Sequence, residues 1–276
     1  MTMQNQDARD CVLDKYLKQI PLDRSDLSYA DLSRMRLPGI KMRSSVLNHA
    51  NIQHTDLTEA RLGNTSLDCA DLRGARLDRA NLARASLRKA QLLECSLVGA
   101  DLDEAVMLRA EASSADFTQA SLLGVNLSAG NLRHAKFNKA HLCSANLTCA
   151  DFSDADLSEA DLTGASLEGT CFYRANLTGA KYGPATLNLG ICSITGLEWP
   201  VFIFDRHIKI GCQMHLTRAW SKFEDEHIAC MANGAVRFWH LHKDTILGLA
   251  KSHQKKGCWY CRTTRIRHTS SMSTSR

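Results

Sequence analysis

The residues best suited to metal or redox chemistry are cysteines and histidines in the last third of the chain. Cys258 and Cys261 form its only CxxC pair, and Cys212 with His215 would be a second pair of ligands. Structural zinc sites need four converging ligands, commonly two close pairs, but the roughly 43 residues between these pairs fit no compact zinc template. A redox role would need a folded setting that lowers a thiol pKa, which a basic tail lacks. We therefore expect no metal site and no redox activity. The other members of this group are Cys230, His227, His240 and His242.

Acidic residues are the candidates for general acid–base catalysis, which needs a shielded pair of carboxyl groups with shifted pKa values. They cluster at Asp101, Asp103 and Glu104 and again over residues 151–161. Most of them face outward in the five-residue repeat of this chain, and an open flat wall does not shield a pair. The sequence holds no nucleophile motif and no phosphate-binding glycine loop. It therefore predicts a protein that is not an enzyme and has no cofactor. The second cluster consists of Asp151, Asp154, Asp156, Glu159 and Asp161.

The five-residue repeat runs without a gap over residues 20–199. Every fifth residue from Leu22 to Leu197 is nearly always Leu and sometimes Phe, and the residue two places earlier is mostly Ala. An Asp or Asn often lies between the two. We predict that the large residues form a structural core. Six residues represent it: Leu57, Leu77, Leu97, Phe117, Phe137 and Leu157.

A period of five matches neither the helical period of about 3.6 nor the strand period of 2. The chain must instead turn once per unit, with the large and small residues inward and the other three outward. Four such sides close a square. One coil cannot bury its own leucines, so stability must come from stacking coil on coil. At Ala112, where alanine replaces the large residue, we expect a local void or bulge.

The pattern small–Asp/Asn–Leu/Phe–polar–any, which covers residues 20–199, resembles that of the pentapeptide-repeat family. This resemblance implies an all-β solenoid, namely a right-handed quadrilateral parallel β-helix in which four repeat units make one coil. The repeat would then make about nine coils. At about 4.8 Å per coil, the strand spacing of a sheet, the rod would be roughly 40 Å long. We expect no ligand pocket in its filled interior.

Both ends of a solenoid expose apolar residues and unpaired strand edges, so each end needs a cap. We predict that residues 1–19 are an N-terminal helical cap with a helix over 8–19. Its apolar side would consist of Val12, Tyr16, Leu17 and Ile20.

At the other end, residues 200–251 form a small C-terminal module. Two apolar runs around a polar turn predict a β-hairpin over 201–212. Two helices should follow over 215–231 and 235–251, with Asp225 as a candidate helix N-cap. The module resembles a C-terminal extension of some bacterial and phage-associated pentapeptide-repeat proteins, which brings no activity with it. It would cap the last coil or act as a separate recognition module.

Charge is unevenly distributed along the chain. Residues 20–199 hold 18 Lys and Arg against 21 Asp and Glu, whereas residues 200–276 hold 13 against 5. The basic tail, residues 252–276, should be disordered and should give only weak, nonspecific contact with nucleic acid. The chain has no secretory apolar region and no apolar run long enough to span a bilayer. It has 11 cysteines, and the six within the repeat share no common phase. We expect no membrane segment and free thiols in a bacterial cytoplasm; export without a hydrophobic signal would escape this test.

Some pentapeptide-repeat proteins protect or inhibit type II topoisomerases by presenting an acidic rod shaped like duplex DNA. That mechanism needs a long negative stripe, because the target is a basic surface. The wall centred on Leu37 and Leu57 alternates in sign instead, from Arg36 to Asp56 to Arg76. A non-enzymatic protein-interaction or scaffolding rod is therefore favoured. The alternatives are a topoisomerase-directed DNA mimic and an exported effector with the rod as a spacer. A basic belt would also interrupt a stripe: Arg73, Arg76, Arg79, Arg84, Arg88 and Lys89.

The candidate contact surface is apolar and its protein partner is unknown. Outward-facing apolar residues in the middle coils fall on different walls and would form a belt. Exposed apolar clusters often mark contacts, although scattered apolar residues are common on surfaces. An end-to-end homodimer is a second way to assemble the rod. The candidate contact residues are Leu93, Val98, Leu108 and Leu123 in the rod and Trp220 and Trp239 in the C-terminal module.

Overall fold

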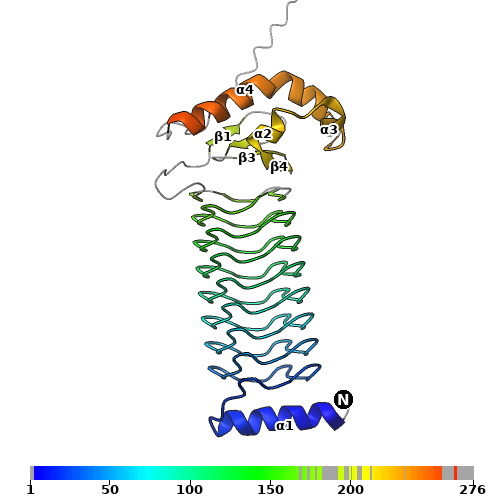
Figure 1. Cartoon of the computed structure of the whole chain (residues 1–276), viewed down its shortest axis with the longest axis vertical. Coiled ribbons are helices and arrows are strands. Elements are labelled where there is room, and N and C mark those ends of the chain that lie inside the picture. Colours follow the sequence, from blue (N-terminus) through cyan, green and yellow to red (C-terminus); the bar gives the residue numbers. More distant parts are fainter. Residues whose placement is uncertain are drawn as a thin grey trace, which may run out of the picture.

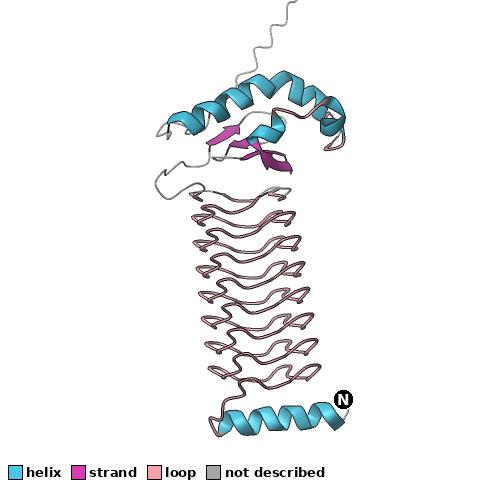
Figure 2. Ribbon diagram, viewed as in Figure 1, coloured by secondary structure: helices cyan, strands magenta, loops and turns pink. Residues whose placement is uncertain are grey.

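A stack of short coils makes up most of the molecule, with helix α1 (Met3–Leu17) at one end and the C-terminal strands and helices at the other (Figure 1). In Figure 2 the coils are drawn as loops, because each coil pairs with the next through single-residue bridges. The computed structural model describes residues 3–167, 170–172, 175–177, 179–181, 192–195, 199, 201–203, 207–211, 213–232, 234–256 and 264–265.

Each coil takes four repeat units, and successive coils pair in parallel. Bridges join equivalent positions of adjacent coils throughout, from Asp26 and Val46 near the N-terminus to Asp161 and Lys181. The predicted parallel β-helix is therefore confirmed. The prediction of nine coils depends on residues 182–199, most of which lie outside the described part of the chain.

Large and small side chains alternate through the interior of the rod. The six representative core residues have exposed fractions of at most 2%. Phe117 and Phe137, one coil apart, stack with ring centroids 4.6 Å apart. The expected bulge at Ala112 is absent, because its N–H donates to the Asn131 carbonyl at 2.8 Å in the regular ladder. The backbone pairing holds that coil in register even though its core residue is small.

A tight turn follows every large residue. In the first turn the Ser25 N–H donates to the Leu22 carbonyl at 3.2 Å, and Arg24 between them has a φ of 60°. Left-handed φ at the third residue is the requirement of a type II turn. The same position recurs every five residues, with Gly99 at 65° and Ala129 at 53°. Most of these positions carry residues other than glycine, so the rod holds much of its backbone in a conformation that favours glycine.

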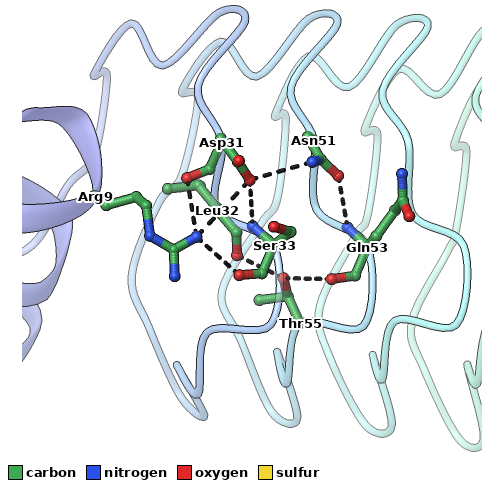
Figure 3. A network of polar contacts seen from close by, with 7 residues as sticks. All are labelled: Arg9, Asp31, Leu32, Ser33, Asn51, Gln53 and Thr55. Atoms are coloured by element: carbon green, nitrogen blue, oxygen red, sulfur yellow. Dashed lines mark hydrogen bonds and ion pairs between the residues drawn. The ribbon is translucent and has the colours of Figure 1, made fainter. Parts of the chain in front are cut away.

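Helix α1 covers the first coil. Val12 is fully buried there, and the guanidinium of Arg9 donates to the Ser33 carbonyl at 2.8 Å and lies 3.8 Å from the Asp31 carboxylate (Figure 3). The Tyr16 hydroxyl donates to the Pro38 carbonyl at 3.1 Å. The predicted N-terminal helix is thus present, and it is fixed by polar contacts to the outer edge of the coil as well as by apolar packing.

Two details of this prediction are wrong. The helix begins at Met3 instead of residue 8, and Leu17 and Ile20 are 70% and 48% exposed. The reason is the end of the helix: Gln19 has a φ of 58°, and the Ile20 N–H reaches back to the Lys15 carbonyl at 2.8 Å. This Schellman ending turns the chain into the first coil and leaves both apolar side chains outside.

The C-terminal module contains a sheet with the order β4-β3-β2-β1-β5. The predicted hairpin is present as β2 (Val201–Ile203) and β3 (His207–Ile210), which pair antiparallel. Three further strands extend it: β1 (Cys192–Thr195), β4 (Gln213–Leu216) and β5 (Thr264–Arg265). Strand β1 pairs with β2, so the module begins before the predicted boundary at residue 199. Strand β5 pairs with β1, so part of the tail expected to be disordered is a strand.

The helices of the module also differ from the prediction. The single helix expected over 215–231 is broken into β4, α2 (Thr217–Trp220) and α3 (Asp225–Ala229), whereas α4 (Ala235–Lys256) runs past the predicted end at 251. Asp225 is the first residue of α3, and Glu224 occupies the N-cap position. Pairing of β4 with β3 overrides the helical spacing of the apolar residues, and the Trp220 indole N–H donates to the Ile208 carbonyl at 2.6 Å.

The sheet closes the C-terminal end of the rod. Met214 is fully buried and joins the core of the coils, and Phe202 packs against it. Lys209 is 1% exposed; its ammonium group donates to the carbonyl of Phe172 in a late coil and lies 4.8 Å from the centre of the Phe202 ring. A buried ammonium group must be paired to be tolerated. The backbone of the rod supplies that pairing, so the module acts as a cap.

Candidate interaction surface

The Asp and Asn residues before each large core residue brace the turns. Asp56 accepts the Thr58 N–H at 3.1 Å and its hydroxyl at 2.7 Å, and Asp151 accepts the Ser153 N–H at 2.9 Å. These contacts are Asx turns, in which a carboxylate replaces a backbone acceptor. The acidic cluster over residues 151–161 therefore consists largely of structural residues. The same contact is made by Asp26, Asp31, Asp71, Asp101, Asp116, Asp156 and Asp161.

These carboxylates stay ionised more readily than free aspartate. Burial opposes ionisation of Asp151, but hydrogen bonds from Ser153 and the charge of Arg133 outweigh it and lower its pKa. For Asp116 burial is likewise outweighed, by Thr118 and then Lys136, and the pKa is lowered. A general acid needs the opposite shift, toward neutral pH. The geometry and the electrostatics thus both suit a structural role.

Opposite charges pair across neighbouring coils. Glu59 and Arg79 lie 3.1 Å apart, and Lys136 lies 3.4 Å from Asp116. In each pair the partners occupy the same place on successive coils. Where the sign of the charge alternates from coil to coil in these pairs, each charge is therefore neutralised by the residue at the same place on the next coil. Each exposed pair contributes only about 0–1 kcal/mol, but together they leave no long negative stripe on this wall. Two further pairs follow the same rule, Arg84 with Glu104 and Lys139 with Glu159.

The predicted apolar belt does not form a continuous patch. Leu93 and Leu123 are 41% and 47% exposed, whereas Val98 and Leu108 are half-buried. Counting from coil to coil places the four on four different walls, and their neighbours on adjacent coils are polar except for Cys143 beside Leu123. Asp103, for example, accepts the Leu123 N–H at 3.0 Å. One flat partner cannot touch all four.

Trp220 and Trp239 were predicted to be contact residues, and this prediction is wrong. Both are 2% exposed and pack on each other in the module core, with ring centroids 5.2 Å apart. Their spacing in the sequence predicts an apolar face but not what covers it. Here α4 covers α2 and the sheet, and Phe223 adds an edge contact to Trp220 at 5.3 Å.

One surface that the sequence analysis missed is basic. The wall that starts at Leu22 carries four exposed cations in its first coils, with no ion-pair partner among the described residues. We call this set the basic wall: Arg24, Lys41, Arg43 and Arg61. Lys41 and Arg61 are bridge partners on adjacent coils, about 4.8 Å apart at the backbone. Elsewhere such neighbours often carry opposite charges. Sorting all four walls of the sequence would have revealed it.

The sign of this wall reverses two coils further on. Asp101, Asp103 and Glu104 occupy the three outward positions of its unit centred on Leu102. Glu104 is neutralised by Arg84 at 2.9 Å, while Asp101 accepts an amide hydrogen bond from Asn81 at 2.9 Å. The basic wall therefore covers a short distance, on the order of 10 Å along the rod, and ends at acidic residues.

The part of the chain that the structure describes contains no cluster of His, Cys, Asp and Glu able to hold a metal ion. The predicted pair Cys258 and Cys261, like Cys212, lies outside the described residues. His240, a candidate ligand, lies 2.9 Å from the Asp225 carboxylate on the exposed side of the module. None of the helices described is both long and apolar enough to cross a membrane.

Taken together, a square parallel β-helix with braced turns and a filled interior defines a repeat protein of the pentapeptide class. The Pentapeptide repeats family profile matches in 8 copies, over residues 25–64, 65–103, 95–133, 126–164 and 150–179. These matches span more than half of the chain. The protein belongs to the pentapeptide-repeat family, and its coils form a right-handed β-helix. No curated protein matches the chain at a significant level.

Several solved structures resemble the chain. HetL, a pentapeptide repeat protein involved in heterocyst differentiation regulation in the cyanobacterium Nostoc, is 29% identical over 61% of this chain and 90% of its own, with a TM-score of 0.29. QnrB1, a plasmid-mediated fluoroquinolone resistance protein, is 18% identical over 57% and 92%, with a TM-score of 0.33. Rfr23 from the cyanobacterium Cyanothece is 19% identical over 63% and 94%, with a TM-score of 0.24.

Proposed function

We propose that this protein is a non-enzymatic binding rod whose basic wall docks an acidic segment of a partner protein. The observation that carries the proposal is the pairing of Lys41 with Arg61 on adjacent coils. Like charges placed side by side on neighbouring strands are destabilising. On the next wall the rod places opposite charges, Glu59 and Arg79, at equivalent positions of adjacent coils, whereas here it places two cations. An acidic partner would supply the missing counter-charge.

The neighbours of the basic wall suit a flat docking surface. Gly63 is buried and Ala83 half-buried, and Ser44 and Asn64 present short polar side chains between the cations. Asp23 lies among them, where it accepts the Arg43 N–H at 2.8 Å. A small, rigid wall of this kind loses little side-chain entropy on binding, apart from the cations themselves.

A protein segment fits this wall better than a nucleic acid. A duplex or a long single strand laid along the rod would run from the basic wall onto Asp101, Asp103 and Glu104, where like charge repels it. The outward positions of the basic wall itself carry no aromatic residue on which bases could stack. The exposed Tyr29, which stacks on His49, lies on the neighbouring wall. A short acidic stretch followed by neutral or basic residues matches the change of sign.

The test is a binding assay with the full chain and a deca-glutamate peptide, followed by fluorescence anisotropy at low salt. Reversing both charges in Lys41→Glu with Arg61→Glu should weaken binding at least tenfold. The matched control is Lys89→Glu with Arg109→Glu, a like-charged pair one coil apart on another wall. It changes net charge equally and should retain binding within about twofold.

Three outcomes would overturn the proposal. Equal loss in both double variants would mean attraction by net charge alone, since the chain carries +5. Duplex DNA of equal charge that binds more tightly than the peptide, and loses binding in the Lys41/Arg61 variant, would assign the wall to nucleic acid. Inhibition of gyrase supercoiling at micromolar protein would support the DNA-mimic alternative instead.

A further inference from the structure

The wall that starts at Leu22 carries unpaired charges of both signs. Besides the cations of the basic wall, it holds the carboxylates of Asp101 and Asp103, and none of the described residues forms an ion pair with either. Asp103 instead accepts the Ser121 hydroxyl at 2.5 Å and the Leu123 N–H at 3.0 Å. We call Asp101 and Asp103 the acidic pair. One face of the rod therefore offers both signs of charge to a partner.

The two sets of charges are too far apart to neutralise each other within one chain. A ladder of bridges runs from Lys41 through Arg61 and Asn81 to Asp101 on four successive coils. Its three steps of about 4.8 Å place the backbones of Lys41 and Asp101 about 14 Å apart. An ion pair needs a separation of about 4 Å or less between the charged atoms. The charges can therefore be matched only by another molecule.

Short side chains separate the two sets of charges. In the column that runs from Arg43 to Asp103, the two intervening coils carry Gly63 and Ala83. Gly63 is buried and Ala83 is half-buried. Asn81, beside them, directs its amide along the wall to Asp101 at 2.9 Å. The middle of the wall is therefore low, and a second flat surface can approach it closely.

We propose that two copies of this protein pair side by side and antiparallel through this wall. The proposal rests on the function proposed above, because it makes a second copy of the chain the acidic partner of the basic wall. The twofold axis lies along the strands, midway between the two sets of charges, and reverses the order of the coils without exchanging the columns. Lys41 of each copy then faces Asp101 of the other, and Arg43 faces Asp103.

The charges select the antiparallel direction. In a parallel pair the twofold axis would run along the rod, so each coil would face the same coil of the other copy and Lys41 would face Arg43. Opposed like charges are unfavourable. In the antiparallel pair, cations face carboxylates at both ends of the contact, and Gly63 faces Ala83 near its centre. Such an isologous contact uses one surface twice and closes on itself.

The small area of the contact makes the pairing weak and dependent on charge. About six coils overlap, and with three outward residues per coil the contact covers on the order of 300 Å² on each copy. A standard stable interface buries about 800 Å² on each partner. The exposed charges at its ends are screened by salt. We therefore expect association at low ionic strength and dissociation at high ionic strength.

Sedimentation equilibrium of the full chain tests the assembly. At low salt the mass should rise with concentration from 30.6 kDa toward twice that value, and about 0.5 M salt should suppress the rise. Asp101→Asn with Asp103→Asn keeps the turn acceptors but removes the charge, and should weaken self-association about tenfold or more. The matched control is Glu94→Gln with Glu111→Gln, which removes the same charge from exposed residues on another wall and should leave self-association unchanged.

A charge swap tests which residues face each other. Lys41→Glu with Arg43→Glu makes the contact acidic throughout, and Asp101→Lys with Asp103→Lys makes it basic throughout, so neither double variant should self-associate. An equimolar mixture of the two should form a heterodimer, because every facing pair then has opposite charges. The same reversal to lysine at the two control glutamates should not restore pairing with the acidic variant. Circular dichroism checks that each variant is folded.

A wild-type chain that stays monomeric at low salt up to its solubility limit would refute the proposal, as would folded swap variants that stay monomeric when mixed. Equal loss in the glutamate control and in the acidic-pair variant would show attraction by net charge alone and would also refute it. Deca-glutamate binding separates this proposal from the one above. Asp101→Asn with Asp103→Asn should bind the peptide like the wild type. A wild-type chain that binds the peptide but never self-associates would retain the proposed function and exclude a second copy as the partner.

Discussion

The ammonium group of Lys209 donates a hydrogen bond to the backbone carbonyl of Phe172, 37 residues earlier in the chain. This contact ties a strand of the C-terminal sheet to a late coil of the rod. The same carbonyl also accepts the Ala175 N–H at 3.1 Å within its own turn, so Lys209 is its second donor. The sheet would otherwise be held to the rod mainly by Met214 and Phe202.

Replacing Lys209 by Met should loosen the cap. The apolar stem is preserved, but the charged hydrogen bond from the ammonium group to the Phe172 carbonyl is lost, and hydrogen bonds to charged groups contribute about 1.5–3 kcal/mol. The carbonyl keeps the Ala175 N–H, which donates to it at 3.1 Å. We expect earlier proteolysis between the rod and the module and a lower midpoint in urea. Lys222→Met is the control, because Lys222 is exposed and its loss should leave both measurements unchanged. Equal stability of the two variants would show that the contact contributes little.

The left-handed turn positions predict a substitution that stabilises the rod. Ala129 has a φ of 53°, which costs alanine roughly 1–2 kcal/mol, so Ala129→Gly should raise stability by up to about 1 kcal/mol after the entropy of the unfolded glycine is deducted. Ala83→Gly, one position earlier in its turn and without positive φ, should instead lower stability by about 0.5–1 kcal/mol. Chemical denaturation distinguishes the two.

Replacing a glycine by alanine at one of these left-handed turn positions should destabilise the rod. Gly99→Ala places a methyl group at a φ of 65°, where the new carbon would lie 3.6 Å from the Arg79 side chain, an ordinary contact. The expected loss of about 1 kcal/mol is therefore backbone strain alone. Unchanged stability in this variant would contradict the assignment of strain to these turns.

Acid should destabilise the rod through its turn-bracing aspartates. Folding lowers the pKa of Asp116 and Asp151 below the ordinary value of 3.8. A lowered folded pKa contributes stability that is complete above the unfolded pKa and is lost as pH falls through the folded pKa. Unfolding in urea should therefore become easier below about pH 4. Asp116→Asn keeps the acceptor for Thr118 and should flatten this dependence. Stability that rises as pH falls would contradict the sign.

Thiol reactivity should divide according to position in the coil. Burial raises the pKa of the Cys95 thiol far above its ordinary value, while Cys11, Cys149 and Cys230 are exposed. With an aromatic disulfide reagent, the exposed thiols should react within minutes and Cys95 only after unfolding, because the thiolate is the reactive form. Cys95→Ala should not change the fast phase. A fast phase that shrinks in this variant would show that the coil opens.

The inward half of the rod could be predicted from the sequence because it depends on local periodicity. Leu57 and Phe137 are buried since every fifth residue must point into the square. The outward half needed more: the basic wall appears only when residues one coil apart, such as Lys41 and Arg61, are placed together on every wall. The predicted apolar belt is not a continuous patch, because Leu93 and Leu123 lie on different walls of the rod although both belong to the middle coils.

The C-terminal module was less predictable, because its strands pair across long separations. Apolar spacing around Trp220 indicates a helix, yet Gln213–Leu216 pairs with β3 and the chain bends at Trp220. Trp239 is buried because its helix, α4, packs over the sheet. No local sequence pattern predicts that packing. At the N-terminus the helix was predictable, whereas the exposure of Leu17 followed from the turn at Gln19.

The five-residue period was enough to predict stacked four-sided coils, because the chain must turn once per unit and bury its large residues between coils; the resemblance to the pentapeptide-repeat family added the right-handed parallel β-helix. Contacts in the folded molecule show which outward charges neutralise each other, as Glu59 and Arg79 do, and which have no ion-pair partner among the described residues, as with Lys41 and Arg61. The tertiary structure also decided how the ends close. These features depend on contacts between residues distant in sequence, whose side chains the repeat leaves free to vary.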